Sequence, residues 1–215
     1  MSERNGASGR LVAVCVGQPR EIDRNGEPAM TSIWKQAVAG AVRAEGVNLD
    51  GDDQADRHNH GGYDKAVYAY SGDDVRWWES ELGRALEPGS FGENLVIDGL
   101  DVTGAVIGER WHVGTVVFEV SEPRIPCWKL NRRLDEARMI QQFRAAGRPG
   151  AYLRIITEGE IEAGQTVMVS DVPDHGLTVG DVAAIHRDRE GAERLLAVDA
   201  MSQASRDWAA ASQAS

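Results

Sequence analysis

Short apolar runs separated by turn residues dominate the first half of the chain. Leu11–Gly17 is an uninterrupted apolar run that ends in glycine, which predicts a buried strand, and Ala66–Tyr70 predicts a second one. Residues 18–31 are rich in turn residues, and 33–47 fits either a strand with a connecting loop or a helix. Ser71, which precedes a glycine and two aspartates, predicts the start of a helix with an apolar face.

The second half of the chain predicts mainly strands. One helix is expected among them, over 134–146, where Gly147 and Pro149 end it. Many short strands with glycine turns are more typical of a closed barrel than of a doubly wound sheet. The expected strands are Leu95–Ile97, Ala105–Ile107, Arg110–Glu119, Tyr152–Thr157 and Thr166–Ser170.

The two ends of the chain differ from its middle. Residues 1–9 are small and polar, which predicts a disordered tail. The segment 171–176 is typical of a linker, and Thr178 predicts the start of two or three short helices rich in alanine. We therefore expect a mainly β fold with added helices (α+β), with a barrel domain over 10–171 and a C-terminal helical subdomain over 172–215.

Charge and composition narrow the class of protein. The 215 residues carry 34 acidic and 23 basic side chains, and the net charge of −11 argues against nucleic acid as the main partner. No apolar run is long enough to span a membrane and the first ten residues lack a signal-peptide core, so we expect a soluble cytoplasmic protein. The basic residues include just three lysines, Lys35, Lys65 and Lys129, so the place of each is informative.

The polar stretch at 50–65 is long for a loop without structure of its own, and such loops often carry function. Two histidines in it would point the same way on an extended segment, yet no third zinc ligand has suitable spacing. We expect them to hydrogen-bond an anion or orient the loop. Two glycines then allow close backbone approach to a ligand, and an aspartate–lysine pair follows. These candidates are His58, His60, Gly61, Gly62, Asp64 and Lys65.

Cys127 is the strongest single candidate for a functional residue. It follows an expected strand, lies between Arg124 and Lys129, and has prolines nearby that restrict the backbone. Adjacent cations favour a thiolate, which is both a nucleophile and a ligand for soft metals. The alternative is a buried structural cysteine. Cys15, inside its apolar run, is expected to serve packing alone, and two cysteines cannot form a disulfide framework.

Two other motifs are weaker. FGENL at 91–95 places Asn94 in a glycine-containing turn, where its amide caps the turn or contacts a ligand. GEIEAGQT at 159–166 resembles a phosphate-binding loop, but Gln165 replaces its lysine and the segment lies between expected strands, which favours a β-turn. The sequence contains neither GxSxG nor GxGxxG.

Together these segments resemble the MOSC family, the domain found at the C-terminus of molybdenum cofactor sulfurases, and within it the stand-alone bacterial members of the YiiM type. The likeness covers about residues 10 to 210. Departures are small: the stretch 57–59 differs from a more often aliphatic one, and the match around Lys35 is looser. The segments that carry it are GDDQADRHNHGGYDKAVYAY (51–70), FGENL (91–95), VSEPRIPCWKL (120–130), YLRIITEGEIEAGQTV (152–167) and Thr178-Val179.

The resemblance implies a barrel-like fold with added helices and a bound molybdenum cofactor (Mo-molybdopterin). It implies that Cys127 ligates molybdenum or carries sulfur as a persulfide, and that N-hydroxylated compounds such as hydroxylamino-purines and amidoximes are reduced. Lys65 and the loop 58–62 would then face the pterin or its phosphate, while Arg124 and Lys129 flank the metal, and all would line one cleft with Cys127. The full set of expected cofactor contacts is Lys35, His58, His60, Gly61, Gly62, Asp64, Lys65, Asn94, Arg124 and Lys129.

Such a reductase requires a small N-hydroxylated substrate and an external electron donor protein of the flavin or thiol type, because the sequence lacks iron–sulfur spacing and a dinucleotide fingerprint. Two other functions stay open. One is a sulfur carrier in cofactor maturation that uses a Cys127 persulfide, and the other is a non-catalytic module that binds the cofactor or another anion. Neither nucleic acid nor a membrane is expected as a partner, and the oligomeric state is open, with a dimer as one option.

Overall fold

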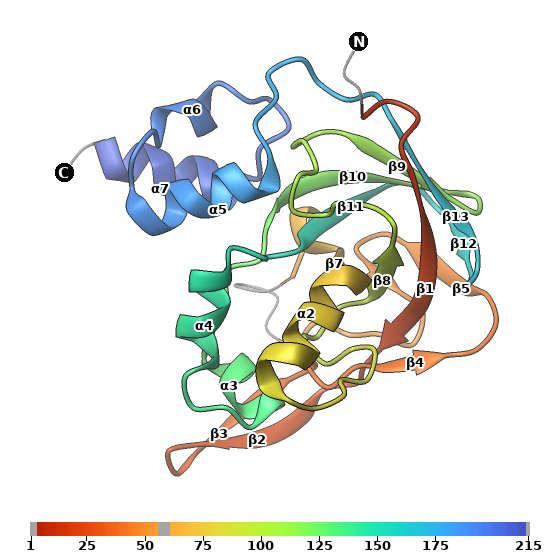
Figure 1. The fold of residues 1–215 in the computed structure, drawn as a ribbon, viewed down its shortest axis with the longest axis vertical. Coiled ribbons are helices and arrows are strands. Elements are labelled where there is room, and N and C mark those ends of the chain that lie inside the picture. Colours follow the sequence, from red (N-terminus) through yellow and green to blue (C-terminus); the bar gives the residue numbers. More distant parts are fainter. Residues whose placement is uncertain (1–3, 56–60, 214–215) are drawn as a thin grey trace.

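A closed β-barrel forms the centre of the computed structural model, which describes residues 4–55 and 61–213 (Figure 1). Within these residues seven strands form the barrel, and the first strand pairs with the last to close it. All neighbours are antiparallel except β7 and β8. In spatial order the strands are β13 (Thr166–Ser170), β9 (Arg110–Val113), β10 (Val116–Pro123), β11 (Ala151–Thr157), β7 (Val67–Ser71), β8 (Leu95–Asp98) and β1 (Ser8–Val16).

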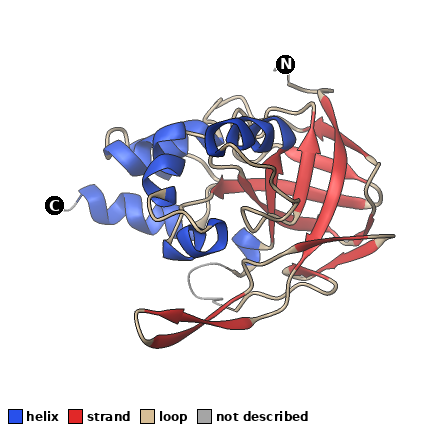
Figure 2. Ribbon diagram, turned by 60° about the horizontal axis from the view of Figure 1, so that its bottom comes forward, coloured by secondary structure: helices blue, strands red, loops and turns tan. Residues whose placement is uncertain are grey.

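Smaller sheets and helices surround the barrel. The helices gather on one side of it, and a two-stranded hairpin projects beside them (Figure 2). The additional strands are β4 (Gln36–Val38) on the edge of β1, the hairpin β2 (Arg20–Arg24) and β3 (Glu27–Thr31), and the sheet of β12 (Gly159–Ile161), β5 (Val42–Glu45) and β6 (Asn48–Leu49). The helices are the 3-10 turn η1 (Tyr63–Lys65), α2 (Gly72–Leu82), α3 (Trp128–Leu134), α4 (Met139–Ala146), α5 (Val179–Asp188), α6 (Glu193–Leu196) and α7 (Gln203–Gln213).

Two apolar clusters hold these layers together. The larger fills the barrel, where Trp111 and Phe118 are fully buried, and continues without a break to Ile185 and Leu195 of the C-terminal helices. Because successive side chains of a strand point to opposite faces, β7 and β11 also present tyrosines outward. These tyrosines join a second group, here called the aromatic cluster, which packs α2, α3 and α4 against the barrel. Its buried members are Tyr68, Tyr70, Trp78, Phe91, Leu130, Leu134, Met139, Phe143 and Tyr152.

Much of the expected architecture is present. The fold is mainly β with helices, and the barrel expected from the short strands is confirmed. Ser71 is the N-cap of α2, accepting a hydrogen bond from the Asp73 amide, and Thr178 forms a reciprocal capping box with Asp181 at the start of α5. No helix in the described parts of the chain is long and apolar enough to cross a membrane.

Two expected strands are wrong. Ala105–Ile107 forms no strand, because turns on either side leave a single bridge between Val106 and Thr178. Arg110–Glu119 is not one strand either. The chain reverses at Gly114, whose φ of +57° suits glycine, so that β9 and β10 pair with each other as a hairpin.

The helix expected over 134–146 is present as α4, but it begins later than expected, and Leu134 is instead the last residue of α3. Asp135 adopts a left-handed backbone conformation with a φ of +51° and ends α3, so α4 begins again at Met139. For segment 33–47 the strand alternative is confirmed and the helix alternative is wrong, because β4 pairs with β1 and β5 pairs with β12.

The predicted disordered tail is wrong for residues 4–9, while residues 1–3 lie outside the described chain. The Arg4 guanidinium binds both carboxylate oxygens of buried Glu109, each at 2.9 Å, and β1 already begins at Ser8. A charge-assisted pair of this kind fixes the chain end on the barrel.

Candidate functional site

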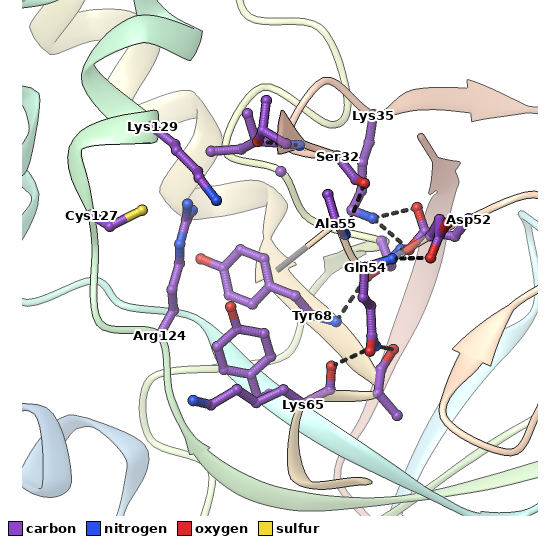
Figure 3. Close-up of a pocket in the computed structure, with 17 residues that line it drawn as sticks. Ser32, Lys35, Asp52, Gln54, Ala55, Lys65, Tyr68, Arg124, Cys127 and Lys129 are labelled. Carbon is purple, nitrogen blue, oxygen red and sulfur yellow. Dashed lines mark hydrogen bonds and ion pairs between the residues drawn. The ribbon is translucent and has the colours of Figure 1, made fainter. Parts of the chain in front are cut away.

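Residues far apart in the sequence meet in one cleft, here called the site cleft, which contains about 610 Å³ of empty space (Figure 3). It opens where the loop after β3, the loop before η1, β7 and the start of α3 come together. Lys65, Cys127 and Lys129, expected to share a cleft, all line it. The residues singled out from the sequence that line the cleft are Lys35, Lys65, Asn94, Arg124, Cys127 and Lys129.

Helix α3 holds Cys127 and Lys129 at the wall of the site cleft. Cys127 is the N-cap residue of α3 in an extended conformation, and its side chain makes no capping hydrogen bond. Leu130 and Leu134 anchor the helix because both are buried in the aromatic cluster. The sequence-based expectation of a simple loop around Cys127 is therefore corrected: the thiol lies at the entry to a helix.

Arg124 is a buried cation beside this thiol. Its guanidinium donates a hydrogen bond to the Phe91 carbonyl and lies 5.1 Å from the centre of the Tyr68 ring. Figure 3 shows the side chains of Arg124, Cys127 and Lys129 directed toward the same part of the cleft. A cation stacked on an aromatic face keeps its position and its charge, since an arginine does not lose its proton in proteins.

Lys65 is held in place by a carboxylate. Its Nζ lies 3.3 Å from Oε1 of Glu122 and 6.0 Å from the centre of the Tyr152 ring. The other oxygen of Glu122 accepts hydrogen bonds from the hydroxyls of Ser202, at 2.7 Å, and Ser205, at 3.1 Å. Ser202 and Ser205 therefore hold the Glu122 carboxylate in place, and this carboxylate in turn holds the Lys65 ammonium.

Lys35 and Asn94 line the cleft, but their polar atoms serve a network within the protein. The Lys35 ammonium binds both carboxylate oxygens of Asp52, and burial lowers the pKa of Lys35 below its ordinary value. Asn94 Nδ2 donates to Asp52 Oδ2 at 2.9 Å and to the Cys15 carbonyl at 3.1 Å, while its Oδ1 accepts from the Tyr68 amide at 3.1 Å. This network joins β1, β7 and the loop that carries Asp52.

Other sequence candidates lie elsewhere. Asp64 does not line the site cleft: its carboxylate accepts hydrogen bonds from Arg154 Nε at 2.8 Å and from the Gln203 amide at 3.0 Å, so it faces the C-terminal helices. Gly61 and Gly62 are also absent from the lining, and the Gly62 amide donates to Gln54 at 2.9 Å. His58 and His60 lie outside the described residues. No group of three potential metal ligands occurs among the residues that are described.

The sequence did not single out four residues that build the cleft: Asp52, Gln54, Tyr68 and Tyr152. Gln54 ties the loop together, donating to the carbonyls of Val47 at 2.8 Å and Lys65 at 3.2 Å. Burial raises the pKa of Tyr152 to about 12, so its phenol remains protonated near neutral pH. The signal for both tyrosines was available: strand alternation places them on the outer face of β7 and β11.

Comparison with known proteins agrees with this structure. The MOSC domain family matches residues 56–168. YflK of Bacillus subtilis is 32% identical over 197 residues, which are 90% of this chain and 89% of that one, and YiiM of Escherichia coli is 34% identical over 164 residues, which are 74% and 71% of the two chains. A Gibberella moniliformis protein named a reductase is 33% identical over 195 residues, which are 88% of this chain but 34% of the fungal one.

Solved structures show the same architecture. The crystal structure of YiiM from Geobacillus stearothermophilus superposes with a TM-score of 0.78 at 25% identity, covering 95% of this chain and 98% of that one. YiiM from Escherichia coli superposes with a TM-score of 0.72 at 26% identity, covering 94% and 90%. The family match covers more than half of the chain, and the two bacterial relatives are more than 30% identical to it over most of their own length. The chain therefore belongs to the MOSC domain family.

Proposed function

We propose that this protein binds the molybdenum cofactor in the site cleft and reduces small N-hydroxylated compounds there, with Cys127 as the metal ligand. The observation that carries the proposal is the shared position of the Cys127 thiol, the Arg124 guanidinium and the Lys129 ammonium in one cleft. Membership of the MOSC family and the fungal relative named a reductase support it.

The donor set fits this cofactor. A molybdenum–pterin group presents a soft metal centre and an anionic phosphate, which require a sulfur ligand and clustered cations. The cleft supplies one thiol, and Arg124, Lys65 and Lys129 supply positive charge.

The chain's own groups have separable tasks in this reaction. Reduction of R–NHOH to R–NH₂ consumes two electrons and two protons and releases water. When bound, the cofactor supplies a metal centre that accepts the substrate's oxygen atom. Arg124 and Lys129 would bind the anionic parts of the cofactor, and the protonated phenol of Tyr152 is placed to donate a hydrogen bond within the cleft. The electrons would come from an external flavin or thiol protein.

The cleft also has an approach for substrate. A neighbouring hollow shares Lys65, Cys127 and Lys129 with the site cleft and extends to the β2–β3 hairpin, where the Arg24 guanidinium lies 5.1 Å from the centre of the Trp128 ring. A small molecule entering along this hollow would meet the thiol before it reached the Lys35–Asp52 pair.

Cys127→Ser tests the proposal in protein produced by a cofactor-competent host. We expect wild-type protein to contain about one molybdenum per chain and to turn over benzamidoxime or 6-hydroxylaminopurine with a chemical reductant, and we expect Cys127→Ser to abolish turnover. Cys15→Ala, which changes the buried cysteine of β1, is the matched control and should retain activity. Turnover by molybdenum-loaded Cys127→Ser protein would refute the mechanism.

The same preparations separate the other two functions. A persulfide mass shift on Cys127 without molybdenum would indicate a sulfur carrier. Wild-type protein with neither molybdenum turnover nor a persulfide would indicate a binding module.

A further inference from the structure

Behind Arg124 lies a second cavity, here called the arginine cavity, with about 710 Å³ of empty space. It lies between α4, the segment 124–126 and α5, and Arg124 is the residue that it shares with the site cleft. Four arginines line it, and no carboxylate does so among the described residues. These arginines are Arg124, Arg144, Arg148 and Arg187.

The positive charge of this cavity is only partly balanced by nearby acids. Arg148 pairs with Asp74 and Arg187 pairs with Asp188, at 2.7 Å, although neither acid lines the cavity. Arg144 is exposed, and its side chain makes no hydrogen bond or ion pair with any described residue. In a chain with a net charge of −11, a group of four arginines around one concave site attracts anions.

The rest of the cavity is apolar. Ile125, Pro126, Phe143 and Pro149 form one side, and Ala183 and Ala184 of α5 face it from the other. An apolar wall with charged groups around it is the usual form of a site for a small molecule that combines a flat apolar body with a charged group. His186 adds a polar group to the lining of the cavity. The centre of its ring lies 4.2 Å from the centre of the Trp208 ring, and its Nε2 forms a hydrogen bond with the Ser205 hydroxyl.

We propose that the arginine cavity is a second binding site, specific for a phosphate monoester that carries an aromatic or other flat apolar group. Several guanidinium forks suit a phosphate better than a single carboxylate, because a phosphate offers three acceptor oxygens and up to two negative charges. The site adjoins the cofactor site, with Arg124 as the shared residue, and does not depend on the proposed reductase activity.

Isothermal titration calorimetry of the 215-residue protein with phenyl phosphate tests this site. We expect binding to weaken at least about tenfold in the double variant Arg144→Gln/Arg187→Gln, since both substitutions remove a charged hydrogen-bond donor for the phosphate. Both side chains are exposed, so the fold should be unaffected. Arg138→Gln, the same change at an exposed arginine outside the cavity, is the matched control and should bind as the wild type does.

Other probes define what is recognised. Inorganic phosphate and benzoate should each bind more weakly than phenyl phosphate, because the first lacks the apolar body and the second lacks the doubly charged group. Ala184→Glu, which adds a negative charge to the wall, should reduce binding of phenyl phosphate as the double variant does.

Lys129→Gln distinguishes the two cavities, because Lys129 lines the site cleft and not the arginine cavity. We expect this variant to bind phenyl phosphate with unchanged affinity. The proposal is overturned if wild-type protein shows no binding at millimolar phenyl phosphate, or if affinity is lost in Lys129→Gln and retained in Arg144→Gln/Arg187→Gln.

Discussion

Lys35 and Asp52 form a buried ion pair whose further contacts come from segments far apart in the chain. Asp52 also accepts hydrogen bonds from the Gly17 amide, at 2.8 Å, and from Asn94. Breaking a buried pair by removing one charge leaves the other without compensation, which costs more than the pair itself contributes. The Lys35–Asp52 pair is therefore first of all a support for the loop at the edge of the site cleft.

Asp52→Asn should destabilise the protein strongly. The variant leaves the buried Lys35 ammonium without its carboxylate, and we expect the free energy of unfolding to fall by about 3–5 kcal/mol, measured by urea denaturation at neutral pH. Asp50→Asn removes the same charge from an exposed neighbour and should change the free energy by less than about 0.5 kcal/mol. Equal effects of the two variants would mean that the pair carries no structural role.

His186 should make stability depend on pH. Burial, and to a lesser degree the charge of Lys65, lower the pKa of His186 below its ordinary value. The unfolded chain therefore binds the proton more readily than the folded protein, so stability is lost as the pH falls through the ordinary value. Between about pH 7.5 and about pH 5.5, wild-type protein should lose more free energy of unfolding than His186→Asn, by no more than about 1.4 kcal/mol per pH unit.

His112→Asn is the control for this measurement, because His112 is exposed. A His186→Asn variant with the same pH dependence as the wild type would contradict the assignment.

Which residues lie at the site was easier to predict than what their polar atoms do. Lys35, Asn94 and Cys127 were all identified from motifs, and all line the cleft. That Lys35 and Asn94 use their polar atoms within the protein depends on Asp52 and on β1, which reach them only in the folded chain. Residue type and spacing therefore predict which residues line the site cleft, while the partners they meet in the folded chain decide what their polar atoms bind.

At the scale of elements, the N-terminus of α7 supports the turn that carries Lys65. Two links connect them: Ser202 and Ser205 bind the Glu122 carboxylate that pairs with Lys65, and the Gln203 amide binds Asp64. The helical tail, which the sequence indicated as an appendage, therefore contributes to the geometry of the cleft without lining it.

The double variant Ser202→Ala/Ser205→Ala should loosen this support. Glu122 would keep its charge but lose both hydroxyl donors, and leaving such a buried group unsatisfied costs about 1–3 kcal/mol. Urea denaturation should show a loss in that range, and hydrogen exchange should increase in the 61–66 peptide. Ser212→Ala removes a hydroxyl of the same helix that donates to the Trp208 carbonyl and does not contact Glu122, and exchange at 61–66 should then be unchanged.

Element boundaries were the least predictable level. The capping residues Ser71 and Thr178 predicted helix starts correctly because capping is a local interaction. The start of α3 directly after Cys127 was missed because no side chain caps it. Its position depends instead on Leu130 and Leu134 packing in the aromatic cluster, which is a tertiary contact.

For the molecule as a whole, the apolar core does not divide at the expected linker. Leu195 of α6 is fully buried in the same cluster as the barrel side chains, whereas its neighbour Leu196 is partly exposed. A shared core couples the stability of barrel and tail, so both should unfold in one transition.

Leu195→Ala should therefore destabilise the barrel as well as the tail. We expect a loss of about 2–5 kcal/mol in the free energy of unfolding, with the same midpoint for hydrogen exchange in β13 and in α7. Leu196→Ala should lie within about 0.5 kcal/mol of the wild type. Two separate transitions, with Leu195→Ala affecting α7 alone, would show that the tail is an independent unit.

The pairing of β1 with β13 also has a consequence for how the chain folds. Ser8 lies opposite Met168, so the barrel closes between its first strand and its last. Contacts between such distant residues slow folding, because most of the chain must be ordered before they form. During synthesis β1 emerges long before β13, and the edge of its first three residues, which pairs with β13, stays unpaired until then. The step at which this protein most needs protection from aggregation is therefore the interval between translation of its first strand and closure of the barrel.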